Sequence, residues 1–411
     1  MMKRILVLVF AVVMIFAVSA EESNIGKMDV KRGEAVVLDD VQPAAVITAQ
    51  GGKYSISISG NINMKASYDF DGSIDSPDFI PSSISVPGTY DSQRRFYMDA
   101  TTSRVELKGA AHTDEFGDVE LCLNMDFRGG SVGSYMPRVR LAYITVGGFS
   151  AGRNFTTFCD MGSIAPNIDF QGSNSCPFIY TTQVRYVKPI LDDRFILGGA
   201  IEYLDYQSSS LGDDATFQYQ EKYLPDVIGY IQYNWGDQVD SHTRLTGLYK
   251  NIALYNTALE KDVNLNGWGT QLSGSIEMCK YLKLYYSGTC GEGITNYMQD
   301  LYGSGLDATV TSGTDAEARM TFMYGWQAAA LAQLTDATMV SAGYSEVNIN
   351  GSESRFAASD YRKGEYLFAN IFYSLSPRIQ LATEFLWGKR TNNDGASNHA
   401  NRINTMIQYN F

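Results

Sequence analysis

Five arginines are the residues whose type and placement suggest binding chemistry. They are Arg104, Arg138, Arg140, Arg153 and Arg185. A guanidinium is planar and always charged, and it grips a carboxylate through two parallel hydrogen bonds. The segment 158–178 carries two opposing carboxylates, Asp160 and Asp169. Arginines facing such a segment predict a site that attracts and orients small anions. The alternative is that they only neutralise acids such as Asp126 and Glu120.

Catalytic and metal chemistry have little support in the sequence. The three histidines are His112, His242 and His399, and none stands clearly in the setting that a Ser–His hydrolase requires. Neither HExxH, repeated CxxC nor a phosphate-binding P-loop occurs. We therefore predict a protein that is not an enzyme, binds no metal and needs no cofactor.

The cysteines number five, so at least one is a free thiol or pairs between chains. Cys159 and Cys176 bracket the segment 158–178, and a disulfide between them would fix its base. Packing of two small buried side chains is the alternative. Cys279 and Cys290 are not expected to pair, because Cys279 lies in a short turn and Cys290 lies near the far end of the strand that follows it.

The elements that must position these residues are strands. From Tyr54 to Phe411 the chain alternates polar and apolar residues with a period of two, which indicates strands with unlike faces. About sixteen runs follow this pattern: 54–70, 94–112, 117–128, 137–147, 149–157, 179–188, 194–206, 226–235, 242–251, 268–278, 281–292, 318–333, 336–349, 362–375, 378–391 and 400–411. Short turns and long loops alternate between them, which is typical of an outer-membrane barrel.

The faces of these strands predict an all-β, transmembrane antiparallel β-barrel with a hydrated interior. A soluble β-sandwich also alternates, but it explains neither the strand length nor the alternation of loops. Aromatic residues stand near strand ends, where a membrane interface is expected: Tyr203, Tyr230, Tyr233, Trp235 and Trp387. A barrel of about sixteen strands leaves an aqueous channel. We expect short periplasmic turns, long external loops and a third long loop, 158–178, folded into the lumen.

Alternation places most of the five arginines inside this barrel. Arg104 on strand 94–112, Arg138 and Arg140 on strand 137–147, and Arg185 on strand 179–188 face inward. The phase of Arg153 is ambiguous because strand 149–157 is weakly patterned.

The two ends of the chain carry features of export and insertion. Residues 1–20 resemble a cleaved signal peptide, with Lys3 and Arg4 before an apolar core and small residues before Glu21; a single membrane anchor is the alternative. Residues 21–53 then form a short periplasmic segment, and residues 54–411 the barrel. The ending with Tyr409 and Phe411 resembles the insertion signal that the barrel-assembly machinery reads.

Composition and charge exclude other classes of protein. Charged residues make up 19% of the chain, aromatic residues 12%, and glycines number 38, which is unlike a disordered chain, a collagen or a coiled coil. The net charge of −13 makes nucleic acid an unsuitable partner. Outer-membrane lipid and small solutes remain as the expected partners.

Several short stretches, in order and spacing, resemble the DcaP-like outer-membrane porins. They are Arg138-Val-Arg-Leu-Ala-Tyr, Gly152-Arg-Asn-Phe-Thr-Thr-Phe-Cys-Asp, Asp169-Phe, Gln183-Val-Arg-Tyr, Leu224-Pro-Asp-Val-Ile-Gly-Tyr, Tyr324-Gly-Trp, Ser376-Pro-Arg and Asn401-Arg-Ile. The resemblance implies a trimeric, sixteen-stranded porin that passes small anionic solutes, dicarboxylates among them. It also implies that Arg138, Arg140 and Arg185 lie at the constriction. Arg153-Asn154 and the cysteines depart from the family pattern.

We therefore expect passive diffusion of small hydrophilic solutes across the bacterial outer membrane, biased toward anions by arginines in the lumen. The alternative is a non-conducting outer-membrane barrel with a structural or surface-binding role.

Overall fold

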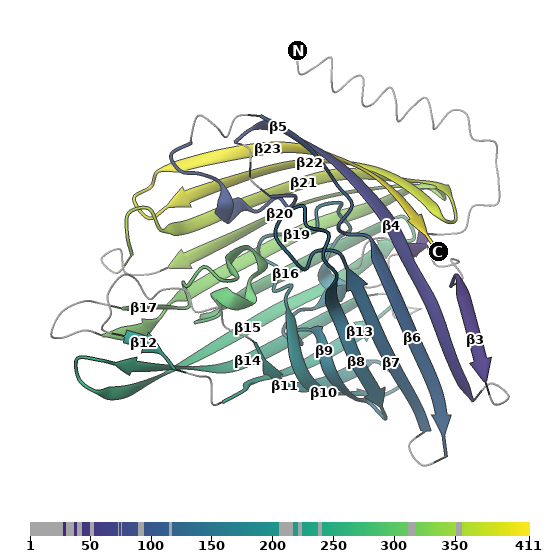
Figure 1. The fold of residues 1–411 in the computed structure, drawn as a ribbon, viewed down its shortest axis with the longest axis horizontal. Coiled ribbons are helices and arrows are strands. Elements are labelled where there is room, and N and C mark those ends of the chain that lie inside the picture. The colour runs from purple at the N-terminus through teal and green to yellow at the C-terminus, as the bar shows by residue number, and fades with distance from the viewer. Residues whose placement is uncertain are drawn as a thin grey trace.

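The computed structural model shows a closed antiparallel β-barrel crossed by inward-folded loops (Figure 1). The structure describes residues 28–29, 37–38, 43–49, 53–72, 74, 76–88, 94–114, 117–204, 217–220, 224–236, 241–310, 317–350 and 356–411. The predicted signal peptide, residues 1–20, lies outside these ranges. No helix among the described residues is both long and apolar enough to cross a membrane.

Sixteen strand positions form the wall among the described residues. They are β4 (Tyr54–Asp71), β5 (Arg95–Asp99) with β6 (Arg104–Thr113), β7 (Gly117–Asp126), β8 (Arg138–Val146), β9 (Phe149–Phe155), β10 (Tyr180–Ile190), β11 (Phe195–Tyr203), β13 (Asp226–Trp235), β14 (Ser241–Asn256), β15 (Lys261–Cys279), β16 (Leu282–Glu292), β19 (Phe322–Thr335), β20 (Thr338–Asn350), β21 (Tyr361–Ser376), β22 (Ile379–Asn392) and β23 (Ser397–Asn410). The barrel closes where β23 pairs with β4 in the register Tyr409↔Ile62. The predicted barrel is confirmed.

Smaller strands extend the wall or lie apart from it. The strand β3 (Ala45–Ala49) pairs with the start of β4, so hydrogen bonding to the wall begins within the segment predicted to precede the barrel. The strand β12 (Phe217–Tyr219) pairs with the far end of β14. Two further pairs join β1 (Met28–Asp29) to β2 (Val37–Leu38) and β17 (Ala308–Val310) to β18 (Ala318–Met320).

The predicted strand boundaries need three corrections. The run 318–333 begins with β18, which pairs with β17 and not with the wall, so the wall strand is β19 alone. The run 94–112 is divided, because a turn closed by the Ser103 amide and the Ala100 carbonyl separates β5 from β6. The predicted loop 252–267 is largely strand, since β14 and β15 stay paired as far as Asn256↔Lys261. Its polar residues obscured a period-two pattern whose apolar face packs on Phe217 and Ala308.

The two faces of the wall differ as predicted. Ile62, Met64 and Ile407 point outward and remain 57%, 38% and 46% exposed, whereas their neighbours Asn63 and Gln408 are buried in the interior. Lipid offers no hydrogen-bond partners, so an apolar outer face over fully paired strands suits a membrane. One predicted interface aromatic, Tyr230, instead points inward, where the Arg244 guanidinium lies 3.6 Å from its ring centre.

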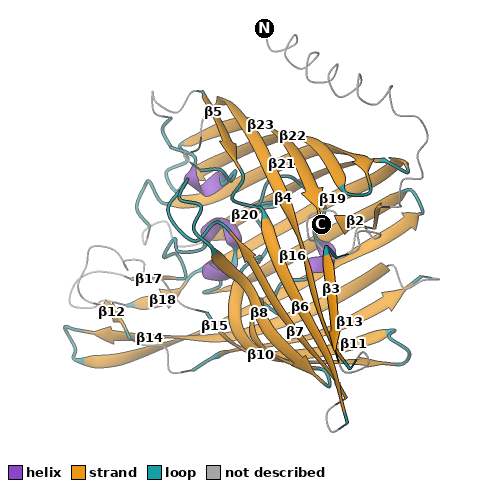
Figure 2. Ribbon diagram, turned by 45° about the vertical axis from the view of Figure 1, so that its right-hand side comes forward, coloured by secondary structure: helices purple, strands orange, loops and turns teal. Residues whose placement is uncertain are grey.

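Three long loops, and not only the third, have segments inside the barrel. We name these segments L1 (residues 76–88), L3 (residues 156–179) and L6 (residues 293–307). They carry the short helices η2 (Pro81–Ser83), η4 (Met161–Ser163), η5 (Thr295–Tyr297) and η6 (Gln299–Leu301), drawn in purple within the barrel outline in Figure 2. Each helix is a single tight turn, a form suited to short connectors.

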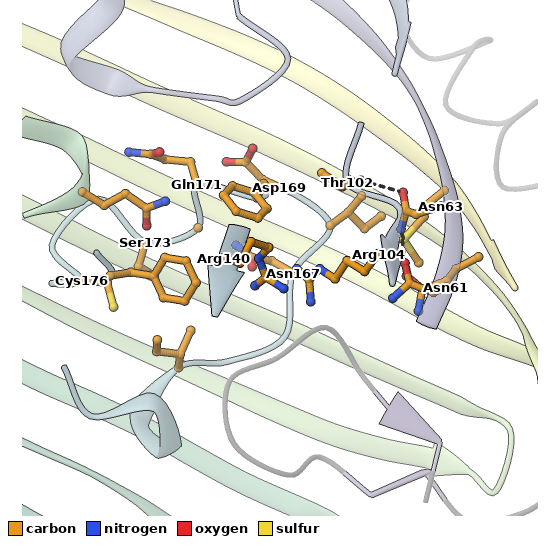
Figure 3. Close-up of a pocket in the computed structure, with 18 of the residues that line it drawn as sticks. Asn61, Asn63, Thr102, Arg104, Arg140, Asn167, Asp169, Gln171, Ser173 and Cys176 are labelled. Atoms are coloured by element: carbon orange, nitrogen blue, oxygen red, sulfur yellow. Dashed lines mark hydrogen bonds between the residues drawn. The ribbon is translucent and has the colours of Figure 1, made fainter. Parts of the chain in front are cut away.

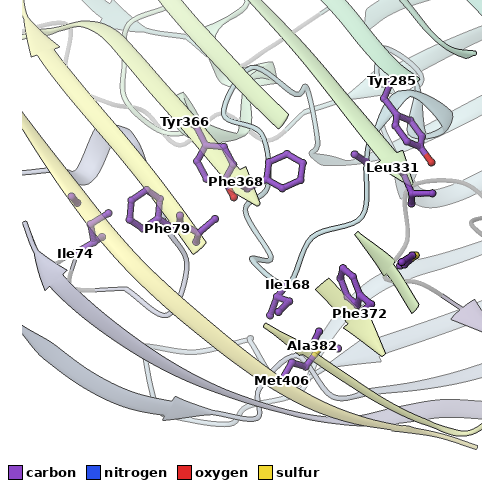
Figure 4. Close-up of a cluster of buried hydrophobic side chains, with 14 of the residues drawn as sticks. Ile74, Phe79, Ile168, Tyr285, Leu331, Tyr366, Phe368, Phe372, Ala382 and Met406 are labelled. Atoms are coloured by element: carbon purple, nitrogen blue, oxygen red, sulfur yellow. The ribbon is translucent and has the colours of Figure 1, made fainter. Parts of the chain in front are cut away.

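Apolar side chains hold these loops against the wall. Phe79 of L1 and Ile168 of L3 join Tyr366, Phe368 and Phe372 of β21 in one buried cluster (Figure 4). This part of the lumen is therefore apolar, a feature that the prediction of a hydrated interior did not include. A loop that folds inward leaves water, and burial of apolar surface against the wall stabilises that arrangement.

Candidate functional site

A pocket lies between L3 and the opposite wall and is the part of the lumen where predicted site residues gather. Figure 3 shows Arg104 and Arg140 on the wall side and Asn167, Asp169, Gln171 and Ser173 on the L3 side. The lining is completed by Asn61, Asn63, Thr102, Phe155, Ile164, Ile168, Phe170, Gly172, Cys176, Phe178, Gln299, Phe372, Met406 and Gln408. Its formally charged side chains are two arginines and one aspartate.

Arg140 is placed by an irregularity in the sheet. Opposite β7, the register steps from Asn124↔Leu141 to Met125↔Val139, so Arg140 is the extra residue of a bulge. Bulges re-aim side chains next to functional sites. The guanidinium is 1% exposed, and it donates from Nε to Tyr180 Oη at 3.0 Å and from Nη1 to Asn124 Oδ1 at 2.9 Å.

Arg138 and Arg140 share one carboxylate. Arg138 donates to Asp126 through Nε at 3.0 Å and Nη2 at 2.5 Å, and Arg140 Nε lies 3.7 Å from the same group. The alternative reading, in which arginines neutralise lumen acids, is thus correct for Arg138. Because two guanidiniums meet one carboxylate, however, the group as a whole keeps a positive charge.

The remaining predicted arginines divide between the pocket and its surroundings. Arg104 lines the pocket. Arg153 lies outside the lining, with Nε 3.2 Å from the Val139 carbonyl and its guanidinium over the Tyr180 ring. Arg185 supports the base of L3, donating from Nε to Thr157 Oγ1 at 2.8 Å and from Nη2 to the Phe155 carbonyl at 2.5 Å.

The two predicted aspartates of L3 are held by groups other than the expected lumen arginines. Asp160 accepts hydrogen bonds at 2.9 Å from His242 and 2.8 Å from Ser273, and it caps η4 through the Gly162 amide. Burial opposes ionisation of Asp160, but His242 holds its pKa below the usual value. His242 also contacts Ser275 at 3.2 Å; Ser275 is 1% exposed inside this network and presents no open face to a substrate.

Asp169 joins L3 to L1 and to the wall. It accepts the Phe79 amide at 3.0 Å and the Tyr366 hydroxyl at 3.1 Å. Burial raises the pKa of Asp169 to about 6. Asp300 of L6 repeats the arrangement with the Ser82 amide and the Tyr361 hydroxyl, each at 3.1 Å, and burial raises its pKa to about 6 as well.

Sequence reasoning missed the charged residues that fix L3 to the wall. Glu202 is fully buried and accepts from Thr156 at 2.7 Å, the Thr157 amide at 2.5 Å and Thr181 at 3.1 Å, so one carboxylate holds both ends of the loop. Across the lumen, Glu384 accepts the amides of Ile168 and Asp169, each at 2.8 Å. Both glutamates stand in the inward phase of predicted strands, which is the one indication that the sequence offered.

Arg128 was also missed; it lies in the loop that follows β7 and links that loop to L1. It forms a two-pronged ion pair with Asp78, and its guanidinium lies 4.5 Å from the ring centre of Phe170 on L3. Burial opposes ionisation of Asp78, but Arg128 holds its pKa below the usual value. Arg138 approaches the same ring at 5.6 Å, so Phe170 is in contact with two cations.

The predicted disulfide and insertion residues have well-defined surroundings. The Sγ atoms of Cys159 and Cys176 lie 3.8 Å apart, and all five cysteines are thiols in this structure. The side chain of Tyr409 is 44% exposed, on the outer face. Phe411 exchanges backbone hydrogen bonds of 2.9 and 3.0 Å with Gly60 at the barrel seam. Among the described residues, no cluster of His, Cys, Asp and Glu is placed to hold a metal.

The comparison with known proteins agrees with this architecture. The family model for the DcaP outer membrane protein matches residues 42–411. The chain belongs to the DcaP outer membrane protein family. No curated protein matches it. Its family indicates a bacterial outer-membrane channel rather than an enzyme, and confirms the resemblance noted in the sequence.

Several solved outer-membrane proteins are similar in fold to this chain. The outer membrane channel DcaP of Acinetobacter baumannii is 20% identical, with a TM-score of 0.75 over 89% of this chain and 100% of that one. The outer-membrane expressed OmpT of Vibrio cholerae is 12% identical, with a TM-score of 0.55 over 89% and 100% of the two chains. An anion-selective porin from Comamonas acidovorans is 11% identical, with a TM-score of 0.55 over 87% and 100%. At these identities the likeness shows the fold alone.

Proposed function

We propose that this DcaP-family protein is a passive diffusion pore for small hydrophilic solutes, with a bias toward anions such as dicarboxylates. The observation that carries the proposal is the pocket lining, where Arg104 and Arg140 face a single carboxylate, Asp169. Because burial raises the pKa of Asp169 to about 6, part of its negative charge is lost in mildly acidic conditions. The surrounding amides and hydroxyls can form hydrogen bonds with a polar solute in place of the water of its hydration shell.

Two guanidiniums near one passage also favour solutes with two carboxylates. Arg138 and Arg140 leave one positive charge beyond Asp126, and the Arg104 guanidinium also lines the pocket. A guanidinium pairs with a carboxylate through directed hydrogen bonds as well as charge. One structural neighbour, the porin from Comamonas acidovorans, is anion-selective, and it supports the proposal by analogy only.

The test is ion selectivity in planar bilayers. Wild-type protein in a salt gradient is expected to give stepwise currents and a reversal potential whose sign shows preferential passage of anions. Arg104→Gln combined with Arg140→Gln is expected to move that potential toward the cation side. Arg194→Gln is the matched control, since Arg194 is exposed in the turn between β10 and β11. A cation-selective wild-type pore, or a double variant unchanged from wild type, would contradict the anion bias.

One observation favours a second function, a barrel that does not conduct. L1, L3 and L6 meet inside the lumen: Ser82 Oγ of L1 donates to the Asp300 carbonyl of L6 at 2.6 Å, and the Gln299 amide of L6 donates to the Cys176 carbonyl of L3 at 3.2 Å. Under this alternative the loops seal the barrel and the exposed surface binds a partner. Folded protein that inserts into bilayers but passes neither current nor small acids in liposome swelling would establish it.

Assembly and processing belong to the same proposal. We infer a homotrimer, removal of residues 1–20 on export, a periplasmic segment that precedes β3 within residues 21–53, and recognition of Tyr409 and Phe411 by the barrel-assembly machinery. The trimer is supported by a structural neighbour, in-vitro folded OmpT of Vibrio cholerae, which has a trimer form. Light scattering of detergent-purified protein tests the trimer, and amino-terminal sequencing tests the cleavage. Phe411→Ala tests insertion, with accumulation of unfolded protein in the periplasm as the expected result.

A further inference from the structure

The two ends of L3 meet at a pair of buried cysteines. Cys159 comes four residues after the end of β9 at Phe155, and Cys176 comes four residues before the start of β10 at Tyr180. Each cysteine is 3% exposed, and their Sγ atoms lie 3.8 Å apart. The sulfurs are therefore in van der Waals contact across the neck of the loop.

Backbone hydrogen bonds hold each cysteine in place. The Cys159 amide donates to the Thr156 carbonyl at 3.2 Å, and the Cys176 amide donates to the Ser173 carbonyl at 3.0 Å. L6 adds a third bond, from the Gln299 amide to the Cys176 carbonyl. A disulfide requires sulfurs about 2.05 Å apart, so each sulfur has to move by only about 0.9 Å, within reach of side-chain rotation.

We propose that Cys159 and Cys176 form a disulfide in the exported protein, which closes residues 159–176 of L3 into a covalent ring, while the other three cysteines remain thiols. The inference goes beyond the proposed pore function and depends on the outer-membrane location. Chains that reach this compartment pass through the oxidising periplasm, where disulfides form and persist.

The chemical step balances through an external disulfide. One thiolate attacks the disulfide of a periplasmic thiol–disulfide oxidoreductase, and the second thiolate then displaces that enzyme from the mixed disulfide. Two S–H bonds are lost and one S–S bond forms. The two electrons and two protons end on the oxidoreductase, which leaves as a dithiol. This exchange is expected before the barrel closes, while both thiols are still accessible.

The ring would separate the pore-lining part of L3 from movements of its base. Residues inside it line the pocket, among them Asn167, Asp169 and Gln171, and Asp160 within it is tied to β14 and β15. Outside the ring, Glu202 already holds Thr156, Thr157 and Thr181. With the disulfide in place, the two ends of the loop cannot separate, so the loop cannot unfold in that way.

The other cysteines are placed differently. Cys122 is buried on β7, Cys279 is exposed at the end of β15, and Cys290 lies within β16 opposite Tyr324. Cys279 and Cys290 are therefore on neighbouring strands, but the register opposes Cys290 to Thr270 and Cys279 to Leu282, far apart along the wall.

Counting thiols tests the proposal without mutation. Protein taken from outer membranes is denatured with a thiol-reactive alkylating agent and a metal chelator present, and labels are counted by intact mass. Of the five cysteines, three labels are expected without reductant and five after reduction. Five labels without reductant would overturn the proposal, and so would peptide mapping of a bridge between any other pair. Five labels would also be the result if the thiols, with the Met161 sulfur 3.7 Å from Cys159, bound a soft metal instead.

Matched variants link the bridge to the loop. Cys159→Ser and Cys176→Ser are each expected to give four labels with or without reductant, whereas Cys279→Ser is expected to give two and then four. In bilayers, the Cys159→Ser channel is expected to show more open-channel current noise than the Cys279→Ser channel. The wild-type channel is expected to reach the noise of Cys159→Ser only after reduction. Equal noise in all three proteins would remove the proposed role of the ring. Because the label count does not depend on conduction, its failure and a failure of the pore function are distinguishable.

Discussion

Two regions of the inner wall differ in what their polar and charged side chains contact. Along β6 to β8 and the loop after β7, the inward cations Arg104, Arg128, Arg138 and Arg140 border the pocket or the ring of Phe170. Along β20 to β22, the inward polar groups are covered by loops: Ser341 and Asn370 bond to the Pro166 carbonyl, and Glu384 bonds to two amides of L3.

The difference shows how one barrel divides its lumen between docking and passage. On the β20–β22 side, polar atoms are used to satisfy the backbone of an inward loop, which would otherwise lose its hydrogen bonds with water. On the β6–β8 side, Arg138 and Arg140 share the single carboxylate of Asp126, so one positive charge of this group remains to act on a solute. L3 is the boundary between the two regions.

The largest expected effect comes from removing the docking carboxylate. Glu384→Ala leaves the amides of Ile168 and Asp169 buried without an acceptor, which costs about 1–3 kcal/mol for each. L3 is expected to leave the wall, with larger single-channel conductance and faster liposome swelling by bulkier sugars. Glu384→Gln is expected to restore part of the docking. Glu277→Gln, at an exposed position, is the control; unchanged conductance in Glu384→Ala would contradict the assigned docking role.

Acidification is expected to tighten the same junction. Asp169 has an ordinary pKa of 3.8 that burial raises to about 6, so the docked state holds a proton more firmly than an undocked loop does. Protonated Asp169 stabilises the docked loop fully below about pH 3.8, and this stabilisation is lost as pH rises through about 6. Its contribution to the free energy of docking is at most roughly 3 kcal/mol. The fraction of closed time in bilayers is therefore expected to rise from pH 7 to pH 5. Asp169→Asn is expected to flatten that response, while a wild-type channel that opens on acidification would refute the assigned sign.

A smaller, opposite pair of effects tests the arginine region. Asp126→Asn removes the acid that Arg138 and Arg140 share, so anion preference is expected to rise; Arg140→Gln is expected to lower it. A unit charge about 4 Å from an ion in a water-like medium contributes about 1 kcal/mol, or about fivefold in the permeability ratio. Reversal potentials in a salt gradient measure both. Shifts of the same sign in the two variants would show that structure, and not charge, controls selectivity.

The smallest effect is expected at Arg153. Its guanidinium lies beside the Val139 carbonyl and the Tyr180 ring and is not part of the pocket lining. Arg153→Gln is expected to leave the reversal potential unchanged within error, in contrast to Arg140→Gln. A shift as large as that of Arg140→Gln would extend the pore surface to β9.

The candidate site was only partly predictable from the sequence. Alternation placed Arg104 and Arg138 on the inward face, because it decides the face of a regular strand. The partners of Asp160 and Asp169 were not identified, since His242 lies 82 residues from the carboxylate it binds and Tyr366 lies 197 residues from Asp169. The bulge at Arg140 depends on register with β7, which the period-two pattern does not report.

The sequence by itself determined the barrel, its inner and outer faces and the places of most strands. Period-two alternation is a local property, and closure follows because lipid leaves no strand edge unpaired. The tertiary structure alone decided that L1 and L6 join L3 inside the lumen and that Asp126 takes up part of the arginine charge. It also decided that Cys159 and Cys176 come into contact. These outcomes depend on which distant side chains meet across the barrel, and loop residues carry no periodic pattern that specifies such pairs.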